Sequence, residues 1–140
     1  MSNDVLNKKV ADSPAPTTYS PGSLIEFKVV SYKVQTVTGG FLVRVSLQPL
    51  DIVDWPEDED TPDISQLPLN SYTFFFMDNR PSALSQFSLD MEKYMGIEHD
   101  ESNTLRAILE EMRGAAVTFY ISDGPNERGD YKMYMRQNND

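Results

Sequence analysis

The residues of this chain best suited to chemistry are lysines, arginines and tyrosines that alternate along short β-type segments. Residues 131–136 run Tyr-Lys-Met-Tyr-Met-Arg. Strand side chains alternate with period 2, so Lys132, Tyr134 and Arg136 are expected on one side of a strand. Tyrosine rings stack on the bases of a single nucleic-acid strand, while lysine and arginine bind its phosphates. The pattern therefore indicates a surface that binds single-stranded nucleic acid.

Other segments supply residues of the same kinds. The complete candidate set is Lys28, Tyr32, Lys33, Arg44, Tyr120, Arg128, Lys132, Tyr134 and Arg136. Tyr120 shares its strand parity with Thr118, and Arg128 is expected at a hairpin tip, where it can clamp a ligand from the side. An alternative stays open, because any half-exposed antiparallel sheet shows this aromatic and basic alternation without binding anything.

Residues for covalent catalysis or metal binding are scarce. The chain has no cysteine, which excludes disulfides, a thiolate metal site and a cysteine nucleophile. The only histidine, His99, lies between two acids, and no Gly-x-Ser-x-Gly turn accompanies it. The Gly39-Gly40 pair joins two strands, whereas a phosphate-binding loop joins a strand to a helix. We expect no enzymatic activity, no cofactor and no metal.

The net charge of −10 argues at first against a nucleic-acid partner. The predicted β segments at 23–48, 71–78 and 115–136, however, hold six basic against five acidic residues. Much of the acidity lies at 51–63, where seven carboxylates and two prolines occur in thirteen residues. Like charges repel and proline breaks strand ladders, so a solvated loop is expected there. The spacing does not match a calcium loop, and Trp55 within it is expected to pack as a lid on the core.

These candidates must be positioned by a hairpin at 24–48. Ile25, Phe27 and Val29 share one parity, whereas Tyr32 and Val34 share the other. The change of parity predicts a bulge or sharp bend near residues 29–30, as a curled sheet requires. A half-buried strand follows at 41–48, and the Thr38-Gly39-Gly40 connection supplies the turn.

The remaining segments predict three further strands and two helices. Residues 71–78 are apolar on both faces, which predicts a third strand that is central or covered on both sides. Helical spacing follows, first from Pro81, with Asp78 or Asn79 as the cap, to Gly96, and then from Ser102 or Asn103 to Gly114. Two strands at 115–121 and 131–136 end the pattern, with a Gly/Pro-rich hairpin tip between them.

The resulting order, β-β-β-α-α-β-β, is that of the OB-fold, a partly open five-stranded barrel. The fold class is therefore expected to be mainly β with two helices, as an OB-fold-like five-stranded antiparallel barrel. We expect a flexible N-terminal arm at 1–22, a barrel domain at 23–136 and a polar end at 137–140. The domain contains an acidic loop at 51–70 and a helical insertion at 80–113. No apolar run is long enough to span a membrane and no signal peptide is apparent, so a cytoplasmic protein is expected.

The chain resembles the small OB-fold single-stranded DNA-binding proteins that bacteriophages encode. The resemblance spans residues 22–136 and rests on short motifs: Pro21-Gly22, Thr38-Gly39-Gly40, Phe74-Phe75-Phe76, Met112-Arg113-Gly114, Val117-Thr118-Phe119 and Gly129-Asp130-Tyr131. It implies a protein that coats single strands during DNA replication, recombination or repair, in the cytoplasm of the host cell. Many members end in an acidic tail that recruits enzymes, whereas here the acids lie at 51–63.

The sequence thus leaves two alternative functions open. In the first, the protein binds single-stranded DNA, or RNA, without catalysis. In the second, it is an acidic interaction or structural module, a virion or replisome accessory, whose 51–63 loop binds a protein partner and which binds no nucleic acid. No membrane partner is expected, and self-association stays open.

Overall fold

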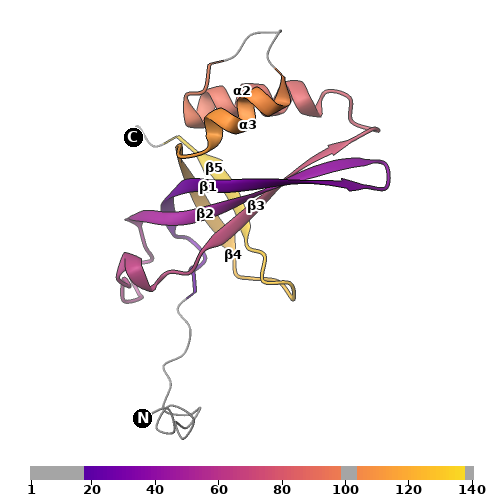
Figure 1. The fold of residues 1–140 in the computed structure, drawn as a ribbon. Coiled ribbons are helices and arrows are strands. Elements are labelled where there is room, and N and C mark those ends of the chain that lie inside the picture. The colour runs from indigo at the N-terminus through magenta and orange to yellow at the C-terminus, as the bar shows by residue number, and fades with distance from the viewer. Residues whose placement is uncertain (1–17, 99–103, 138–140) are drawn as a thin grey trace, which may run out of the picture.

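The computed structural model describes residues 18–98 and 104–137. Its elements follow the predicted order, with a short 3-10 helix, η2, added between the second and third strands (Figure 1). They are β1 (Leu24–Val37), β2 (Gly40–Asp54), η2 (Ile64–Gln66), β3 (Asn70–Met77), α2 (Ala83–Met95), α3 (Leu105–Met112), β4 (Ala116–Asp123) and β5 (Lys132–Arg136).

The five strands form one antiparallel sheet in the order β3-β2-β1-β4-β5. The mainly β architecture with two helices is confirmed, but the sheet is not closed into a barrel. The strands β3 and β5 are its two edges, and no ladder joins them among the described residues. The edges approach where Asn70 Nδ2 lies 3.1 Å from Met133 Sδ. Beyond that point Phe87 of α2 packs against β3, its ring 4.9 Å from that of Phe74, and β5 is only five residues long.

The predicted bulge in the first strand is confirmed. Val29 pairs with Leu47 and Ser31 pairs with Ser46, so Val30 is the extra residue. Before the bulge Val29 is buried, and after it Tyr32 pairs with the buried Val45. The inward-facing parity of β1 therefore changes at Val30, which allows one long strand to serve both halves of a curved sheet.

The hairpin turn needs its glycines. Gly39 has a φ of 83°, a left-handed conformation that favours glycine. A side chain on Gly40 would collide with the carbonyl oxygen of Phe76 on β3. These two positions let β1, β2 and β3 pack closely at the hairpin tip.

Two strand predictions were wrong. The loop expected from residue 51 begins later, because β2 continues to Asp54. Alternation explains this: Ile52 pairs with the buried Ile25, while Asp51 and Asp54 are exposed. The third strand is an edge and not a central strand, and Phe75 on it is 61% exposed.

The helices lie together on one side of the sheet, and the β1–β2 hairpin projects beyond them (Figure 1). Helix α2 buries Phe87 and Met91 and ends as predicted at Gly96, which has a φ of 70°. Its N-cap is Ser82, not Asp78 or Asn79, because turns occupy residues 77–83. Helix α3 is capped by the Thr104 side chain. The predicted start of this helix at Ser102 or Asn103, and His99, lie outside the described residues.

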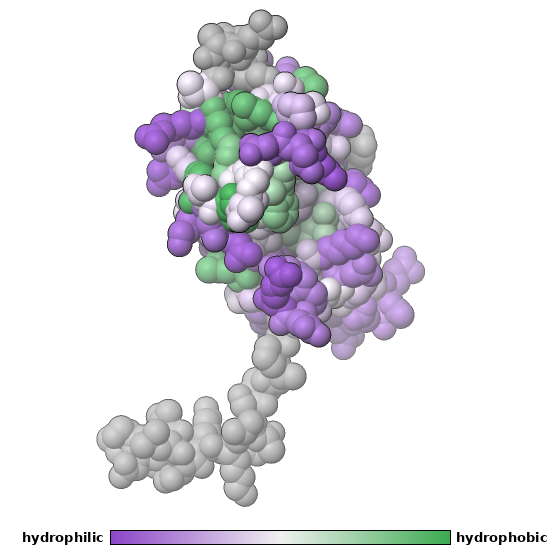
Figure 2. All heavy atoms as spheres, turned by 90° about the vertical axis from the view of Figure 1, so that its right-hand side faces the viewer, coloured by the Kyte–Doolittle hydropathy of each residue, from purple (hydrophilic) through white to green (hydrophobic). Residues whose placement is uncertain are grey.

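The core lies between the inner face of the sheet and these helices. Tyr19, which falls in the predicted N-terminal arm, belongs to it: its side chain is 1% exposed and its hydroxyl donates to the Pro68 carbonyl. Trp55 packs partly buried against the core, in line with the expected lid. Hydrophobic surface remains on the side toward which the hairpin projects (Figure 2). In the described part of the chain, no helix has the length and apolarity needed to cross a membrane.

Candidate nucleic-acid interface

Strand register assigns each candidate residue to one of two sheet faces, because residues paired across antiparallel strands point to the same side. Val43, Val45 and Leu47 on β2 are buried and define the inner face. Residues of the opposite parity form the outer face. By this criterion the strand-borne candidates lie on the outer face, with the exception of Tyr32.

Beyond the bulge, the outer faces of β1, β2 and β3 form a three-by-three array that we call the distal face. Its rows follow directly from the register: Ser31, Ser46 and Ser71; Lys33, Arg44 and Thr73; and Gln35, Leu42 and Phe75. The array holds two cations, several hydroxyls and one aromatic ring, and it contains no carboxylate. In a protein of net charge −10, this area is locally positive.

The two cations of the distal face are available to a ligand. Lys33 and Arg44 are both exposed, and neither forms an ion pair within the described residues. Phe75 lies on β3 beside this pair, offset by one row, and is 61% exposed. An exposed aromatic ring beside free cations supplies both the base-stacking and the phosphate-binding components of single-strand recognition.

A second aromatic and basic group lies on the outer face of β4 and β5. Tyr120 pairs with Tyr134 across these strands. The guanidinium carbon of Arg136 lies 5.4 Å from the ring centroid of Tyr120 and 5.9 Å from that of Tyr134. Lys132 is exposed on the same strand. We call these four residues the β4–β5 patch.

Lys28 lies on the outer face between the two groups, opposite Gln48 on one side and Ala116 on the other. From the sequence alone, the hairpin cations and the last strand belong to one candidate set. In the structure β4 separates β1 from β5, so the candidates form two groups on one face. Acids flank the start of β1, where Glu26 pairs with Asp51.

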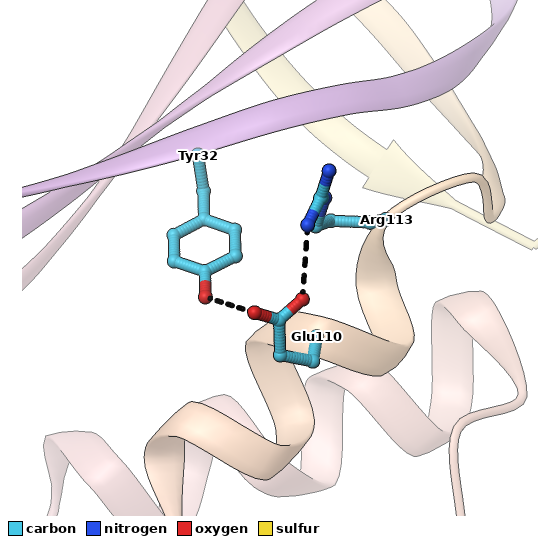
Figure 3. Close-up of polar contacts among 3 residues, drawn as sticks. All are labelled: Tyr32, Glu110 and Arg113. Carbon is cyan, nitrogen blue, oxygen red and sulfur yellow. Dashed lines mark hydrogen bonds and ion pairs between the residues drawn. The ribbon is translucent and has the colours of Figure 1, made fainter.

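Tyr32 lies on the inner face, away from the other candidates. Its hydroxyl donates to Glu110 Oε1 on α3 over 3.1 Å, and the other carboxylate oxygen of Glu110 lies 3.2 Å from Arg113 Nη1 (Figure 3). The pKa of Tyr32 is raised, mainly by desolvation of its hydroxyl and to a smaller extent by the hydrogen bond to Glu110. The bulge is the cause of this placement, because it reverses the parity of β1. Tyr32 therefore joins the sheet to α3 and is not part of the outer face.

Arg128 lies in the turn between β4 and β5 and is exposed. Asn126 organises this turn, since its side-chain oxygen accepts from the backbone N–H groups of Arg128 and Asp130. No strand register links Arg128 to the distal face or to the β4–β5 patch.

Phe75 is the residue that sequence reasoning missed. Its segment is apolar at both parities, which suggested cover on both sides. The signal lies in the β2–β3 register of the structure: Phe75 lies two residues after Thr73, and Thr73 pairs with the charged Arg44. A residue of the same parity as an exposed arginine points to solvent.

The acidic loop after β2, at residues 55–63, does not form a metal site. Asp63 caps η2 by accepting from the Ser65 backbone N–H and hydroxyl, which lowers the pKa of its carboxyl group. No cluster of three or more histidine or acidic side chains able to hold a metal ion occurs among residues 18–98 and 104–137. Glu59 accepts a hydrogen bond from Ser20 and so ties the loop to the start of the domain.

Neither a protein-family model nor a curated protein sequence matches this chain. The function is therefore inferred from the residues of the outer face.

Proposed function

We propose that this protein is a non-catalytic single-stranded DNA-binding protein whose primary contact surface is the distal face. The observation that carries the proposal is the composition of that face: Lys33 and Arg44 lie opposite each other beside the exposed Phe75, with no carboxylate in the array. Phosphates need accessible cations and bases need exposed rings, and here both are adjacent.

The chemistry of the face suits a ligand of mixed sequence. The lysine and the arginine attract phosphates, and the ring of Phe75 can stack on any base, for about 1–3 kcal/mol per stacked base. The serine and threonine hydroxyls of the array can donate to phosphate oxygens. The β4–β5 patch adds two tyrosine rings and two cations for a strand long enough to reach it.

The overall charge does not oppose this function. The 22 acidic residues are concentrated outside the distal face, in particular at 51–63. Over a Debye length of about 10 Å in 0.1 M salt, local charge decides the attraction of a phosphate. The acidic loop at 51–63 would repel phosphates, whereas the distal face would attract them.

We further propose that the sheet is a partly open barrel of the OB type. The strand order β3-β2-β1-β4-β5, the helices between β3 and β4, and the approach of Asn70 to Met133 support this assignment. The role that follows is coating of single strands in phage-type DNA replication, recombination or repair, in the cytoplasm of a host cell. RNA binding is a variant of the same chemistry.

A second candidate function is an acidic interaction module without nucleic-acid binding. The acids at 57–60 favour it, because they are exposed and a basic partner would complement them. Neutralising these four residues would abolish capture of such a partner and would leave DNA binding unchanged.

Fluorescence anisotropy with labelled oligo-dT at low salt separates the two functions. The DNA-binding proposal expects saturable binding at micromolar protein that weakens as salt rises. Absence of binding at tens of micromolar protein would favour the interaction module. A parallel titration with oligo-U compares RNA with DNA.

A further inference from the structure

β3 is an edge strand, so every second residue directs its backbone N–H and C=O groups away from the sheet. One hydrogen bond shows which residues these are. The Asp78 N–H donates to the Gly39 carbonyl over 2.8 Å, one position beyond the Gly40–Met77 pair that ends the β2–β3 register. Antiparallel pairs alternate between bonded and non-bonded, so even-numbered residues of β3 bond to β2. Odd-numbered residues, among them Thr73 and Phe75, direct their N–H and C=O groups away from the sheet.

At the two ends of this edge, an outward backbone group forms a hydrogen bond within the protein. The Ser71 N–H donates to the Asn70 side-chain oxygen over 2.8 Å. The Met77 carbonyl accepts from the Arg80 N–H over 2.9 Å. Between these ends, Thr73 and Phe75 have no backbone partner for their outward groups among the described residues.

The strand itself also lacks the sequence features by which proteins prevent strand addition. Natural edge strands are protected by charge, proline, a bulge or short length. β3 spans eight residues with no charged residue and no proline, and its register with β2 is unbroken. A long, regular, apolar edge of this kind is suited to pairing with another extended chain.

Space for such a chain lies beside the strand. A groove of about 640 Å³ is lined by β3 on one side and by the 79–90 segment on the other. Phe74 and Phe87 provide apolar walls, Gln86 is a polar group along it, and Arg80 and Asp90 are its charged residues.

We propose that the β3 edge binds an extended peptide segment of a partner protein, which adds to the sheet as a sixth strand. An extended peptide backbone supplies donors and acceptors at the spacing of Thr73 and Phe75. Alternate side chains of the peptide would face the apolar walls formed by Phe74 and Phe87, so an alternating apolar sequence is required. This inference does not depend on DNA binding by the outer face.

Thr73 allows a selective test of strand addition. Its N–H points away from β2, so Thr73→Pro removes an edge donor and places a ring there without breaking a β2–β3 hydrogen bond. Thr73→Val is the matched control, since it keeps the N–H and a β-branched side chain. Thermal unfolding of both variants checks that the sheet remains folded.

The probe is a random octapeptide library displayed on phage and selected on the full-length wild-type protein. We expect enriched peptides with apolar residues at alternate positions, which bind wild type and Thr73→Val and lose about tenfold in affinity for Thr73→Pro. Absence of enrichment, or equal binding to Thr73→Pro, would overturn the proposal.

Hydrogen exchange on the wild-type protein gives a second measurement that needs no variant. An enriched peptide should slow exchange of the Thr73 and Phe75 amides. Slowing by oligo-dT but by no peptide would assign the edge to nucleic acid and overturn the proposal. Concentration-dependent slowing in the protein alone, lost in Thr73→Pro, would assign it to a second copy of the chain and overturn it equally.

Discussion

Lys33 on β1 lies directly opposite Arg44 on β2, with both side chains on the outer face of the sheet. Like charges directly opposite each other on neighbouring strands destabilise a sheet. Neither residue forms an ion pair within the described part of the chain, so this repulsion is not offset locally. We infer that this cationic pair, which lies beside an exposed ring, is kept for binding and not for stability.

The first prediction concerns the stability cost of this pair. Lys33→Gln should raise the free energy of unfolding by about 0.2–1 kcal/mol, because it removes the cross-strand repulsion. Urea unfolding measures this as a higher midpoint with unchanged slope. Lys28→Gln is the matched control, since Lys28 lies opposite Gln48 and Ala116 and its removal relieves no like-charge pair. A lower midpoint for Lys33→Gln would contradict the assignment.

The second prediction separates two neighbouring phenylalanines of β3. Phe75 is 61% exposed and Phe76 is 6% exposed. Phe75→Ala should weaken oligo-dT binding by about 1–3 kcal/mol with little change in stability, because a stacked base is lost. Phe76→Ala should lower the free energy of unfolding by roughly 3–5 kcal/mol, because it leaves a cavity in the core. Unchanged DNA affinity in Phe75→Ala would show that the Phe75 ring does not contact DNA.

The third prediction concerns the β4–β5 patch. Tyr134→Ala combined with Lys132→Ala should weaken binding of a long oligo-dT and leave binding of a short one unchanged, because only a long strand reaches both groups. Anisotropy titrations with oligonucleotides of increasing length measure the difference. An equal loss at every length would mean that the β4–β5 patch, and not the distal face, is the primary contact.

The fourth prediction concerns alkaline pH. Burial, with a smaller contribution from Tyr131, raises the pKa of Tyr19 above its ordinary value of 10.0. Burial also raises the pKa of Tyr72, with Asp90 and Tyr134 adding to the effect. The folded state therefore retains protons that the unfolded chain releases, so stability is fully present below pH 10 and falls as pH rises above it.

Tyr19→Phe tests this alkaline dependence. The variant should lose about 1 kcal/mol at neutral pH, since the hydroxyl no longer donates to the Pro68 carbonyl. Its stability should then decline less steeply than that of wild type above pH 10. Urea midpoints across pH 7–11 measure both effects, and parallel curves for the two proteins would contradict the role of Tyr19.

Local alternation predicted much of this fold because it reports burial directly. The bulge at Val30 and the five strands were predictable in this way, and the end of α2 was predictable from the glycine at position 96. The sheet edges were not, because alternation in one segment does not reveal its neighbours. The same limit hid the exposure of Phe75, whose segment is apolar at both parities.

The candidate site was predictable only where neighbouring strands are joined by a tight turn, because the turn then fixes which residues lie opposite each other. Lys33 and Arg44 flank one tight turn, so their common face could be inferred from the glycine turn and the alternation. Tyr32 was grouped with the other candidate contacts, but it lies on the inner face, because the bulge reverses parity between it and Lys28. The separation of β1 from β5 by β4 depends on long-range topology, which no local pattern encodes.

The most direct test of the DNA-binding claim is the salt dependence of oligo-dT affinity for wild type and for the Lys33→Gln, Arg44→Gln double variant. For single strands, each phosphate contact contributes about 0.7 to the slope of log affinity against log salt concentration. The double variant should bind more weakly, and its slope should be shallower by about 1.4. An unchanged slope and affinity would show that the distal face does not bind the phosphates of DNA.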